Sequence, residues 1–499
     1  MSGDGRMDGA VSDRQAGGNS TAGAPPPADP ARQHSNPWPI VAITCIGAAM
    51  GQFDASVVQL ALPDLAVVFQ TRETLASWVA LAYVLAFAAA LPIFGRLCEM
   101  FGRKRLYLAG ILIFVAASAL CGMATSLPEL IAFRILQGIG GASLGANSIV
   151  ILNHAAGKER RARAMGYFSA AQAVGVSLGP IAGGLLLSAF GWQAIFWVTV
   201  PIGLIGAVAG WLILPNDTER DPRPFDWQGA LLLGPSIVSL VLVLNHLADW
   251  GLASLPALGF GIGGIVLLAL FIVREKRTAS PLIDLGIFAS KPFSLGVLAV
   301  LLAFALLYGM FYLMSYAAIR GLDEPPERAG LRLSAIPIAL GIAAPFAGAL
   351  VKRFGTATLA LFGMALAAIA LLTLSLVALE ATPSRMIGMA ALAVFGAGLG
   401  FFMAPNNSAT MGAAPPAFAG EAGALINLAR MLGVSLGVAS SASMLHWRTE
   451  VIAGATNTDV YFYGHPMLGA VETSFGLLFI LALIAAIATW WRRRLEPQT

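Results

Sequence analysis

The sequence predicts an all-α integral membrane protein with fourteen transmembrane helices, built as two six-helix bundles with two further helices inserted between them. Hydrophobic residues make up 58% of the 499-residue chain and charged residues 11%, whereas about a quarter of an ordinary soluble domain is charged. The mean hydropathy is +0.78, and apolar runs of about 20 residues, enough to cross the hydrocarbon core, recur along the chain. A weak internal repeat divides these runs into two halves.

The apolar runs define the predicted domains in order. Residues 1–37 are rich in Gly, Ala, Pro and polar residues, which favours a disordered tail. The N-terminal bundle, 38–214, contains the predicted spans 38–63, 75–97, 105–124, 128–151, 163–188 and 192–214. The linker 215–294 contains the inserted spans 228–247 and 256–273. The C-terminal bundle, 295–491, contains 295–318, 330–350, 356–379, 385–408, 421–443 and 471–491, and a short tail follows at 492–499.

Basic residues indicate how the chain is oriented. Lys and Arg concentrate in the cytoplasmic loops of membrane proteins, and here they cluster in alternate loops, as in "GRLCEMFGRKR", "GKERRARA", "REKR", "KRFG" and the terminal "WRRR". This alternation predicts an even number of spans with both termini in the cytoplasm, and we expect the protein in the cytoplasmic (inner) membrane of a bacterium. The net charge of +4 is then a topology signal and requires no nucleic-acid partner.

Three sequence segments recur in the same order at nearly the same separation. "GRLCEMFGRKR" from Gly95 resembles "GALVKRFGTAT" from Gly348, "GIGGASLGANS" resembles "GLGFFMAPNNS", and the residues GVSLG occur at both Gly175 and Gly433. Together they indicate duplication of a six-helix unit. Small residues every four positions also let helices approach closely, so the GVSLG faces are equally consistent with static packing and with a moving, gating interface.

These motifs together resemble the major facilitator superfamily, and within it the fourteen-span drug:proton antiporters of the EmrB/QacA type. "GRLCEMFGRKR" is similar to the loop 2–3 signature, with Glu99 in place of the usual Asp, and "RILQGIGGA" from Arg134 to the span-four signature. "GVSLGPIAGG" resembles the antiporter signature of span five. "FDASVVQLALP" and "WQAIFWVTVPIG" are similar to first-span and sixth-span signatures, with Thr199 replacing the usual Asn. The resemblance implies two halves that rock about a central site and export drugs in exchange for protons.

Asp54 and Arg134 are the candidate proton-coupling residues. Asp54 is the only acidic side chain well inside a predicted span, and an intramembrane charge is costly and functional by default. Desolvation helps a carboxyl group to hold a proton, which suits a proton carrier. The alternative is a permanently ionised partner of an arginine. Arg134 cannot lose its charge, and the resemblance implies a coupling role for it, although a structural interhelical hydrogen bond remains open.

Six polar residues are candidates for the substrate cavity. On span one, Gln52, Ser56 and Gln59 share a stripe opposite Asp54, and the helical periodicity leaves open which stripe faces the cavity. Gln137 lies beside Arg134 on span four. In span thirteen, Asn427 and Arg430 are one turn apart, and a helix-end anchor is the alternative role for Arg430. The predicted cavity contains one acidic residue and two arginines, which favours neutral, weakly acidic or monocationic lipophilic substrates.

Conformational gating is assigned to two motifs. Loop 2–3 contributes Gly95, Glu99, Gly102 and Arg103, and ion pairs there could lock one arrangement of the half. Taken alone, this basic loop would be only an orientation signal. In span five, the gating candidates are the small and rigid residues of its signature, Gly175, Gly179, Pro180, Gly183 and Gly184.

The sequence contains no phosphate-binding Gly-x-x-x-x-Gly-Lys motif and no metal-ligand spacing, so we expect no cofactor, no metal, no catalytic residues and an ion gradient as the energy source. The expected partners are protons, a small lipophilic substrate and membrane lipid, and the resemblance leaves open a periplasmic adaptor protein. A dedicated metabolite exporter or a proton symporter on the same fold is the main alternative function. A membrane-embedded enzyme or a sensor is remote, because the five histidines are scattered and no large soluble region is predicted.

Overall fold

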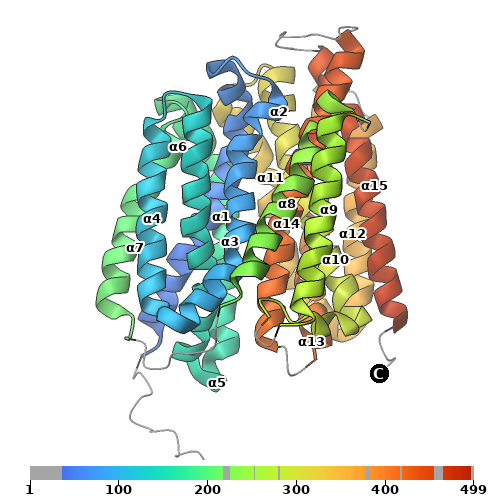
Figure 1. The fold of residues 1–499 in the computed structure, drawn as a ribbon. Helices are drawn as coiled ribbons and strands as arrows, with labels where there is room; N and C mark the ends of the chain where they lie inside the picture. The colour runs from blue at the N-terminus through green and yellow to red at the C-terminus, as the bar shows by residue number, and fades with distance from the viewer. Residues whose placement is uncertain are drawn as a thin grey trace, which may run out of the picture. The chain divides into compact units, whose positions relative to one another are not determined.

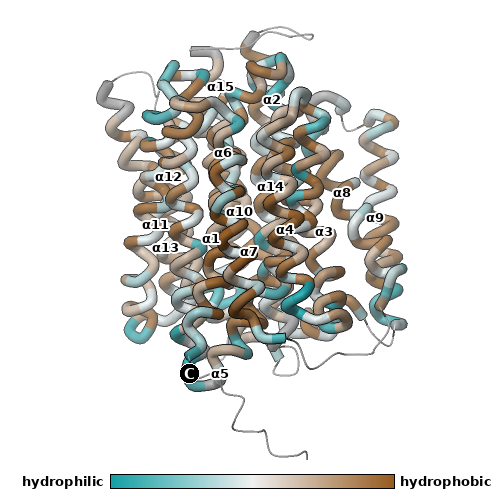
Figure 2. The backbone as a smooth tube through the Cα atoms, turned by 90° about the vertical axis from the view of Figure 1, so that its left-hand side faces the viewer, coloured by the Kyte–Doolittle hydropathy of each residue, from teal (hydrophilic) through white to brown (hydrophobic). Residues whose placement is uncertain are grey.

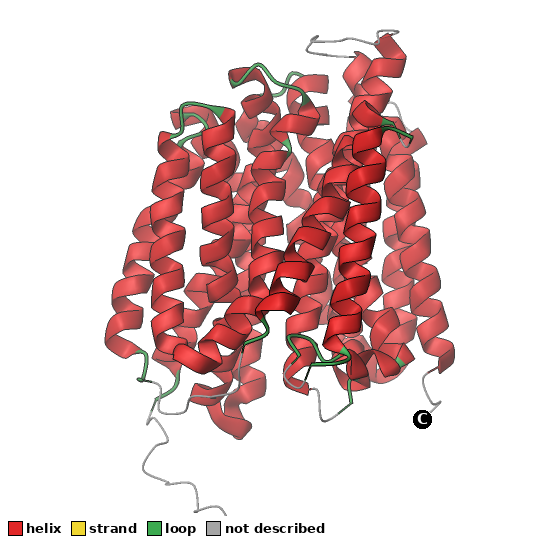
Figure 3. Ribbon diagram, in the orientation of Figure 1, coloured by secondary structure: helices red, strands yellow, loops and turns green. Residues whose placement is uncertain are grey.

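The structure is a computed structural model, which describes residues 36–216, 225–251, 253–278, 281–376, 382–415, 419–453 and 465–495. The regular secondary structure of these ranges is entirely helical (Figure 3). Within them, 14 helices are long and apolar enough to span a membrane, as the sequence predicts. Apolar residues dominate the middle of the helices and polar residues gather near their ends (Figure 2), which is the pattern that a bilayer requires.

The first six spans form the N-terminal set of helices (Figure 1). Within α5, Gly157 has non-helical backbone angles and separates the candidate spans Leu127–Gly157 and Arg163–Phe190. Two short helices, α2 and α6, precede the spans of α3 and α7. The set comprises α1 (Trp38–Val68), α2 (Glu73–Ala76), α3 (Trp78–Phe101), α4 (Arg103–Met123), α5 (Leu127–Phe190), α6 (Ala194–Trp197) and α7 (Thr199–Ile213).

The inserted pair is a helical hairpin formed by α8 (Trp227–Trp250) and α9 (Leu255–Glu275), followed by the short 3-10 helix η2 (Leu285–Ala289). Asp226 accepts a hydrogen bond from Gly229 N at the start of α8 and pairs with Arg274 of α9 at 3.1 Å. Helix α8 packs against both α3 and α14, and Asn245 Nδ2 donates to Ser77 Oγ beside α3 at 3.0 Å. The insertion therefore covers a junction between the two sets.

The last six spans form the C-terminal set. Helix α10 continues into a π-helical turn, η3, which carries the buried Arg320. Most helices of this set extend a few residues beyond the predicted spans. The set comprises α10 (Lys291–Tyr316), η3 (Ala317–Gly321), α11 (Pro326–Phe354), α12 (Thr356–Leu376), α13 (Thr382–Ala413), α14 (Ala419–Ala453) and α15 (His465–Leu495).

The repeated GVSLG segments make equivalent contacts in the two sets. A Cβ atom on Gly175 would collide with the Ala49 carbonyl of α1, and one on Gly433 would collide with the Leu301 carbonyl of α10. Helices α1 and α10 are each the first span of their own set. Both segments thus bring their helix into backbone contact with that first helix, which only glycine permits.

The two sets meet closely at the end of the bundle where α1 ends. Arg320 donates to the Pro63 carbonyl at 3.0 Å, and Tyr312 Oη donates to the Glu73 carbonyl at 3.2 Å. At the same end, α5 and α11 touch: Cβ atoms on Gly184 and Gly330 would collide with the carbonyls of Pro326 and Pro180, respectively. Polar and backbone contacts therefore close this end of the bundle.

Candidate functional site

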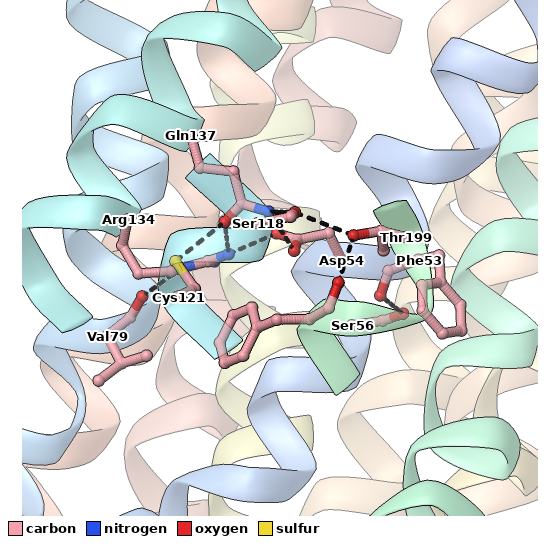
Figure 4. A network of polar contacts seen from close by, with 10 residues as sticks. Phe53, Asp54, Ser56, Val79, Ser118, Cys121, Arg134, Gln137 and Thr199 are labelled. Carbon is pink, nitrogen blue, oxygen red and sulfur yellow. Dashed lines mark hydrogen bonds and ion pairs between the residues drawn. The ribbon is translucent and has the colours of Figure 1, made fainter. Parts of the chain in front are cut away.

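A buried polar network joins five spans of the N-terminal set around Asp54, in α1, α3, α4, α5 and α7 (Figure 4). Asp54 lies in α1, and Arg134 and Gln137 lie one turn apart in α5, so both face the carboxylate. All three side chains are at most 1% exposed. Ser118 of α4 and Thr199 at the start of α7 extend the network away from the carboxylate. The sequence-predicted coupling residues thus lie together in the interior of one half.

Each oxygen of the Asp54 carboxylate has its own donor. Arg134 Nη1 lies 2.6 Å from Oδ2, and Gln137 Nε2 donates to Oδ1 at 2.9 Å. Gln137 Nε2 also lies 2.6 Å from Ser118 Oγ, which accepts a hydrogen bond from Thr199 Oγ1 at 2.9 Å. The carboxylate is therefore held from two sides, and the network continues to the hydroxyls of α4 and α7.

Arg134 uses its guanidinium in three directions. Its Nε donates to the Val79 carbonyl of α3 at 2.8 Å, and its Nη1 donates to Gln137 Oε1 as well as to Asp54. The face of the guanidinium lies over the Tyr83 ring, with Cζ 4.4 Å from the ring centroid. Breaking a buried ion pair by removing one partner costs about 3–5 kcal/mol. Removing the charge of Asp54 or of Arg134 alone should therefore destabilise the site, whereas removing both charges should not.

Four members of this network were not among the sequence-derived candidates: Ser118, Thr199, Val79 and Tyr83. Thr199 was noticed only as a departure from a motif that usually has Asn. Ser118 and Tyr83 are common residue types in apolar helices, and Val79 contributes a backbone carbonyl. A helical wheel could have placed Tyr83 on the face of its span toward the bundle interior, but it could not have identified the helix opposite.

The three polar residues predicted to form a stripe on α1 have different surroundings. Ser56 Oγ donates to the Phe53 carbonyl at 3.0 Å, and the Ser56 side chain faces Gly179 of α5. Gln59 is 1% exposed, and Gln52 is partly exposed. The Ser56 position is thus a helix contact within the N-terminal set, whereas Gln52 keeps solvent access.

The two candidates in the C-terminal set lie well inside α14. Arg430 is 11 residues beyond the start of the helix at Ala419, so it is not at a helix end. Its guanidinium lies over the Phe304 ring of α10, with Cζ 5.4 Å from the centroid. A Cβ atom on Gly145 of α5 would lie 3.5 Å from Asn427 Nδ2. Asn427 therefore faces the N-terminal set, and Arg430 follows it by one turn.

The loop 2–3 residues form a compact ion cluster. Glu99 pairs with Arg96 at 2.8 Å and lies 3.7 Å from Arg103. Gly102, which joins α3 to α4, has φ 103°, a backbone conformation that favours glycine. Its counterpart in the other half, Gly355, has φ 79° and joins α11 to α12. Both halves therefore contain this glycine turn, but Glu99 has no acidic counterpart in the second half.

The five gating candidates of span five divide between two faces. Gly175, Gly179 and Gly183 pack against α1, within the N-terminal set. The Pro180 carbonyl faces Gly330, and Gly184 lies against Pro326, both in α11 of the C-terminal set. The span-five motif therefore packs against α1 within the N-terminal set and against α11 of the C-terminal set.

Comparison with known proteins identifies the family. The model of the Major Facilitator Superfamily matches residues 44–438. The chain is 33% identical to the tetracenomycin C resistance and export protein of Streptomyces glaucescens over 81% of this chain and 75% of that protein. It is 30% identical to the riboflavin transporter RibZ of Clostridioides difficile, over 81% and 87%. A multidrug resistance protein B homolog of Mycobacterium tuberculosis is also 30% identical, over 83% of this chain and 77% of that protein.

Solved structures support the same fold. A bacterial homolog of the human lysosomal transporter Spinster, in an inward-facing and unoccupied conformation, superposes with a TM-score of 0.65 at 15% identity, over 92% of this chain and 98% of that one. A POT family transporter in complex with 5-aminolevulinic acid has the same TM-score at 14% identity, over 91% and 96%. The protein is thus a multi-pass membrane transporter rather than an enzyme, and the chain belongs to the Major Facilitator Superfamily.

Proposed function

We propose that this transporter exports small lipophilic compounds across the bacterial cytoplasmic membrane in exchange for protons, by alternating access. The observation that carries the proposal is the Asp54 carboxylate, fully buried inside a span and paired with Arg134. Relatives whose names state multidrug resistance or drug export support the efflux direction. The distribution of Lys and Arg supports an orientation with both termini in the cytoplasm.

In the proposed cycle, a proton neutralises Asp54 and so removes the charge that holds Arg134 Nη1. Arg134 keeps its charge, and its remaining acceptors are the carbonyl of Val79 and Oε1 of Gln137. Loss of the ion pair loosens α1 from α5. Because the two hydroxyls of the network lie on α4 and α7, proton occupancy at Asp54 is transmitted to four spans of one half.

The moving bodies are proposed to be the halves 38–214 and 295–491. The contacts of Arg320 with Pro63 and of Tyr312 with Glu73 close the end that we assign to the outer face. Opening that end would break these bonds, while the ion cluster around Glu99 holds the opposite end of α3 and α4 together. Such two-state contacts are what an alternating-access cycle requires.

The second candidate is a dedicated transporter of a single compound. It is favoured by relatives whose names specify one substrate each, tetracenomycin C and riboflavin. The two functions differ in breadth of substrate and, for a symporter, in the direction of flux. A panel of unrelated compounds separates them, because a broad exporter responds to many and a dedicated transporter to one.

The test uses everted membrane vesicles with an acidified interior and a pH-sensitive dye, to which lipophilic cations, neutral drugs and weak acids are added in turn. We expect several compounds to release protons with the wild type and none with Asp54→Asn, which keeps the hydrogen-bonding shape without the charge. Thermal unfolding of the purified variant confirms that it is folded. Normal proton release by the folded variant would remove Asp54 from the mechanism.

A further inference from the structure

Arg430 is a cation inside a candidate span, and no described residue pairs with it through a hydrogen bond or an ion pair. Its side chain is partly exposed, but its Nε is buried without an acceptor. The guanidinium lies over the face of Phe304, and a cation–π contact contributes about 0.5–2 kcal/mol. Phe304 supplies no hydrogen-bond acceptor, so the buried Nε–H stays unsatisfied among the described residues.

The fully buried arginines of the described chain differ from Arg430 in having acceptors. Arg134 pairs with Asp54, Arg320 donates to the Pro63 carbonyl, and Arg492 donates to Asn406 and Thr410. Each of these three holds helices together through its donors. Arg430 donates to no described residue, and this difference points to a partner that is not part of the chain.

Arg430 lies close to the junction between the two sets. Asn427, one turn earlier, faces α5 across the junction, and Gly433, one turn later, packs against α10 within its own set. His446, at the closed end beside Glu73, is 16 residues farther along α14, which corresponds to about 24 Å of helix. Arg430 is therefore remote from the closed end, and its side chain is partly exposed.

We propose that Arg430 binds the anionic group of an amphiphilic aromatic substrate, such as a carboxylate or a sulfonate. This inference rests on the proposed export function and names its substrate class. A guanidinium presents parallel N–H donors that match a planar carboxylate, and the Asn427 amide, one turn away, is a further donor. Phe304 and the apolar side chains of α10 offer the surface on which an aromatic body packs.

The proposed anion site and the proton site do not compete for the same groups. Both oxygens of Asp54 are satisfied by Arg134 and Gln137 within the N-terminal set. The substrate anion would be held by the C-terminal set. Each half then contributes one charged element, a proton-carrying acid in one and an anion-binding base in the other.

Two naphthalene probes of matched shape test the assignment: 8-anilinonaphthalene-1-sulfonate, an anion, and N-phenyl-1-naphthylamine, the same scaffold without the sulfonate. Binding to the full-length protein in lipid nanodiscs is measured with empty nanodiscs subtracted. We expect Arg430→Gln to weaken binding of the sulfonate by about 10- to 100-fold, the effect of losing a hydrogen bond to a charged group, and to change binding of the neutral probe less than about twofold. Arg430→Lys should retain part of the affinity for the sulfonate, because the charge remains.

If Arg430→Gln lost the same binding affinity for both probes, Arg430 would be a packing residue and the proposal would be wrong. Unchanged binding of the sulfonate would also overturn it. Arg274→Gln, which removes the same charge in the inserted hairpin outside both sites, serves as the matched control and should keep binding of both probes. Failure of proton coupling for both probes in the wild type would contradict the export function. The binding comparison at Arg430 would be unaffected by that failure.

Discussion

Two intramembrane arginines of this transporter, Arg134 in the N-terminal set and Arg430 in the C-terminal set, have opposite surroundings. In the N-terminal set, Arg134 is fully buried and bonded to a carboxylate, an amide and a backbone carbonyl. In the C-terminal set, Arg430 is partly exposed and contacts only an aromatic ring among the described residues. The two positions are not repeat equivalents, since Arg134 lies in the fourth span and Arg430 in the thirteenth, whose counterpart is the fifth. The packing glycines thus recur in the two sets, whereas these charged groups do not.

The packing surfaces explain how such divergence is tolerated. Gly175 and Gly433 make equivalent backbone contacts with α1 and α10, and Gly102 and Gly355 make equivalent turns. These glycines define how each set folds. Charged side chains between them can change without altering the helix contacts, so one half can hold a proton site and the other a substrate site.

The largest expected effect concerns Arg134, whose guanidinium is paired with Asp54. Arg134→Gln leaves the Asp54 charge buried without its cation, and we expect the free energy of unfolding to fall by about 3–5 kcal/mol. Thermal unfolding in detergent measures this loss.

The double variant Asp54→Asn with Arg134→Gln is the matched control for that prediction. It removes both charges, so most of the lost stability should return. Arg430→Gln, in contrast, removes a cation that pairs with no described anion, and its stability should stay near that of the wild type. If Arg430→Gln lost as much stability as Arg134→Gln, the proposed difference between Arg134 and Arg430 would be wrong.

The sequence predicted the fold well because a bilayer restricts it. Fourteen apolar runs, the duplication and the motif resemblance lead to the family that the comparisons confirm. Helix ends were less accurate: α14 begins at Ala419 and α10 continues into η3. Arg320 therefore fell just beyond its predicted span, and its contact with Pro63 in the other half was not anticipated.

The candidate site was only partly predictable, because periodicity identifies a face of a helix but not the helix opposite. Asp54 stood out as a lone intramembrane acid, and Arg134 and Gln137 are one turn apart, so their common direction followed from the sequence. Ser118 and Val79 belong to helices whose sequences carry no charge near the site. Their roles depend on tertiary contacts, as does the division of the span-five motif between α1 and α11.

The membrane potential offers a second way to sharpen the comparison. If Arg430 carries an anion outward, each transported molecule moves one more negative charge out than a neutral substrate does at the same proton count. That charge is worth about 2.3 kcal/mol per 100 mV. In proteoliposomes with an imposed potassium diffusion potential, export of the sulfonate probe should depend more steeply on voltage than export of its neutral analogue. Identical voltage dependence would indicate that the sulfonate is not transported in its charged form.

The contact between the halves predicts a smaller and different effect. Gly330→Ala places a methyl group against the Pro180 carbonyl of the other set, and overpacking typically costs about 1–3 kcal/mol. The substitution should open the closed end, and a cysteine introduced at Tyr312 should then react faster with a maleimide. Gly341→Ala, in the same helix and with nothing within 4 Å of the added methyl, is the control and should leave that rate unchanged.

The smallest expected effect lies in the inserted hairpin, outside both sites. Although burial raises the pKa of Asp226, hydrogen bonds from Gly229 and Arg274 together with the Arg274 charge outweigh it, so the pKa lies below its ordinary value of 3.8. The folded state therefore favours the carboxylate, and this stabilisation is fully present above the unfolded-state pKa. It is lost only as the pH falls through the lower pKa of the folded protein.

Asp226→Asn keeps the helix cap and loses the ion pair with the half-exposed Arg274, so we expect a loss below about 1 kcal/mol. Asp226→Ala also removes the cap on α8, which adds about 0.5–2 kcal/mol. Thermal unfolding at a single pH well above the pKa of Asp226 should therefore rank the wild type above Asp226→Asn, and Asp226→Asn above Asp226→Ala. A loss in Asp226→Asn as large as that in Asp226→Ala would mean that the ion pair with Arg274, and not the cap on α8, accounts for the stability at this junction.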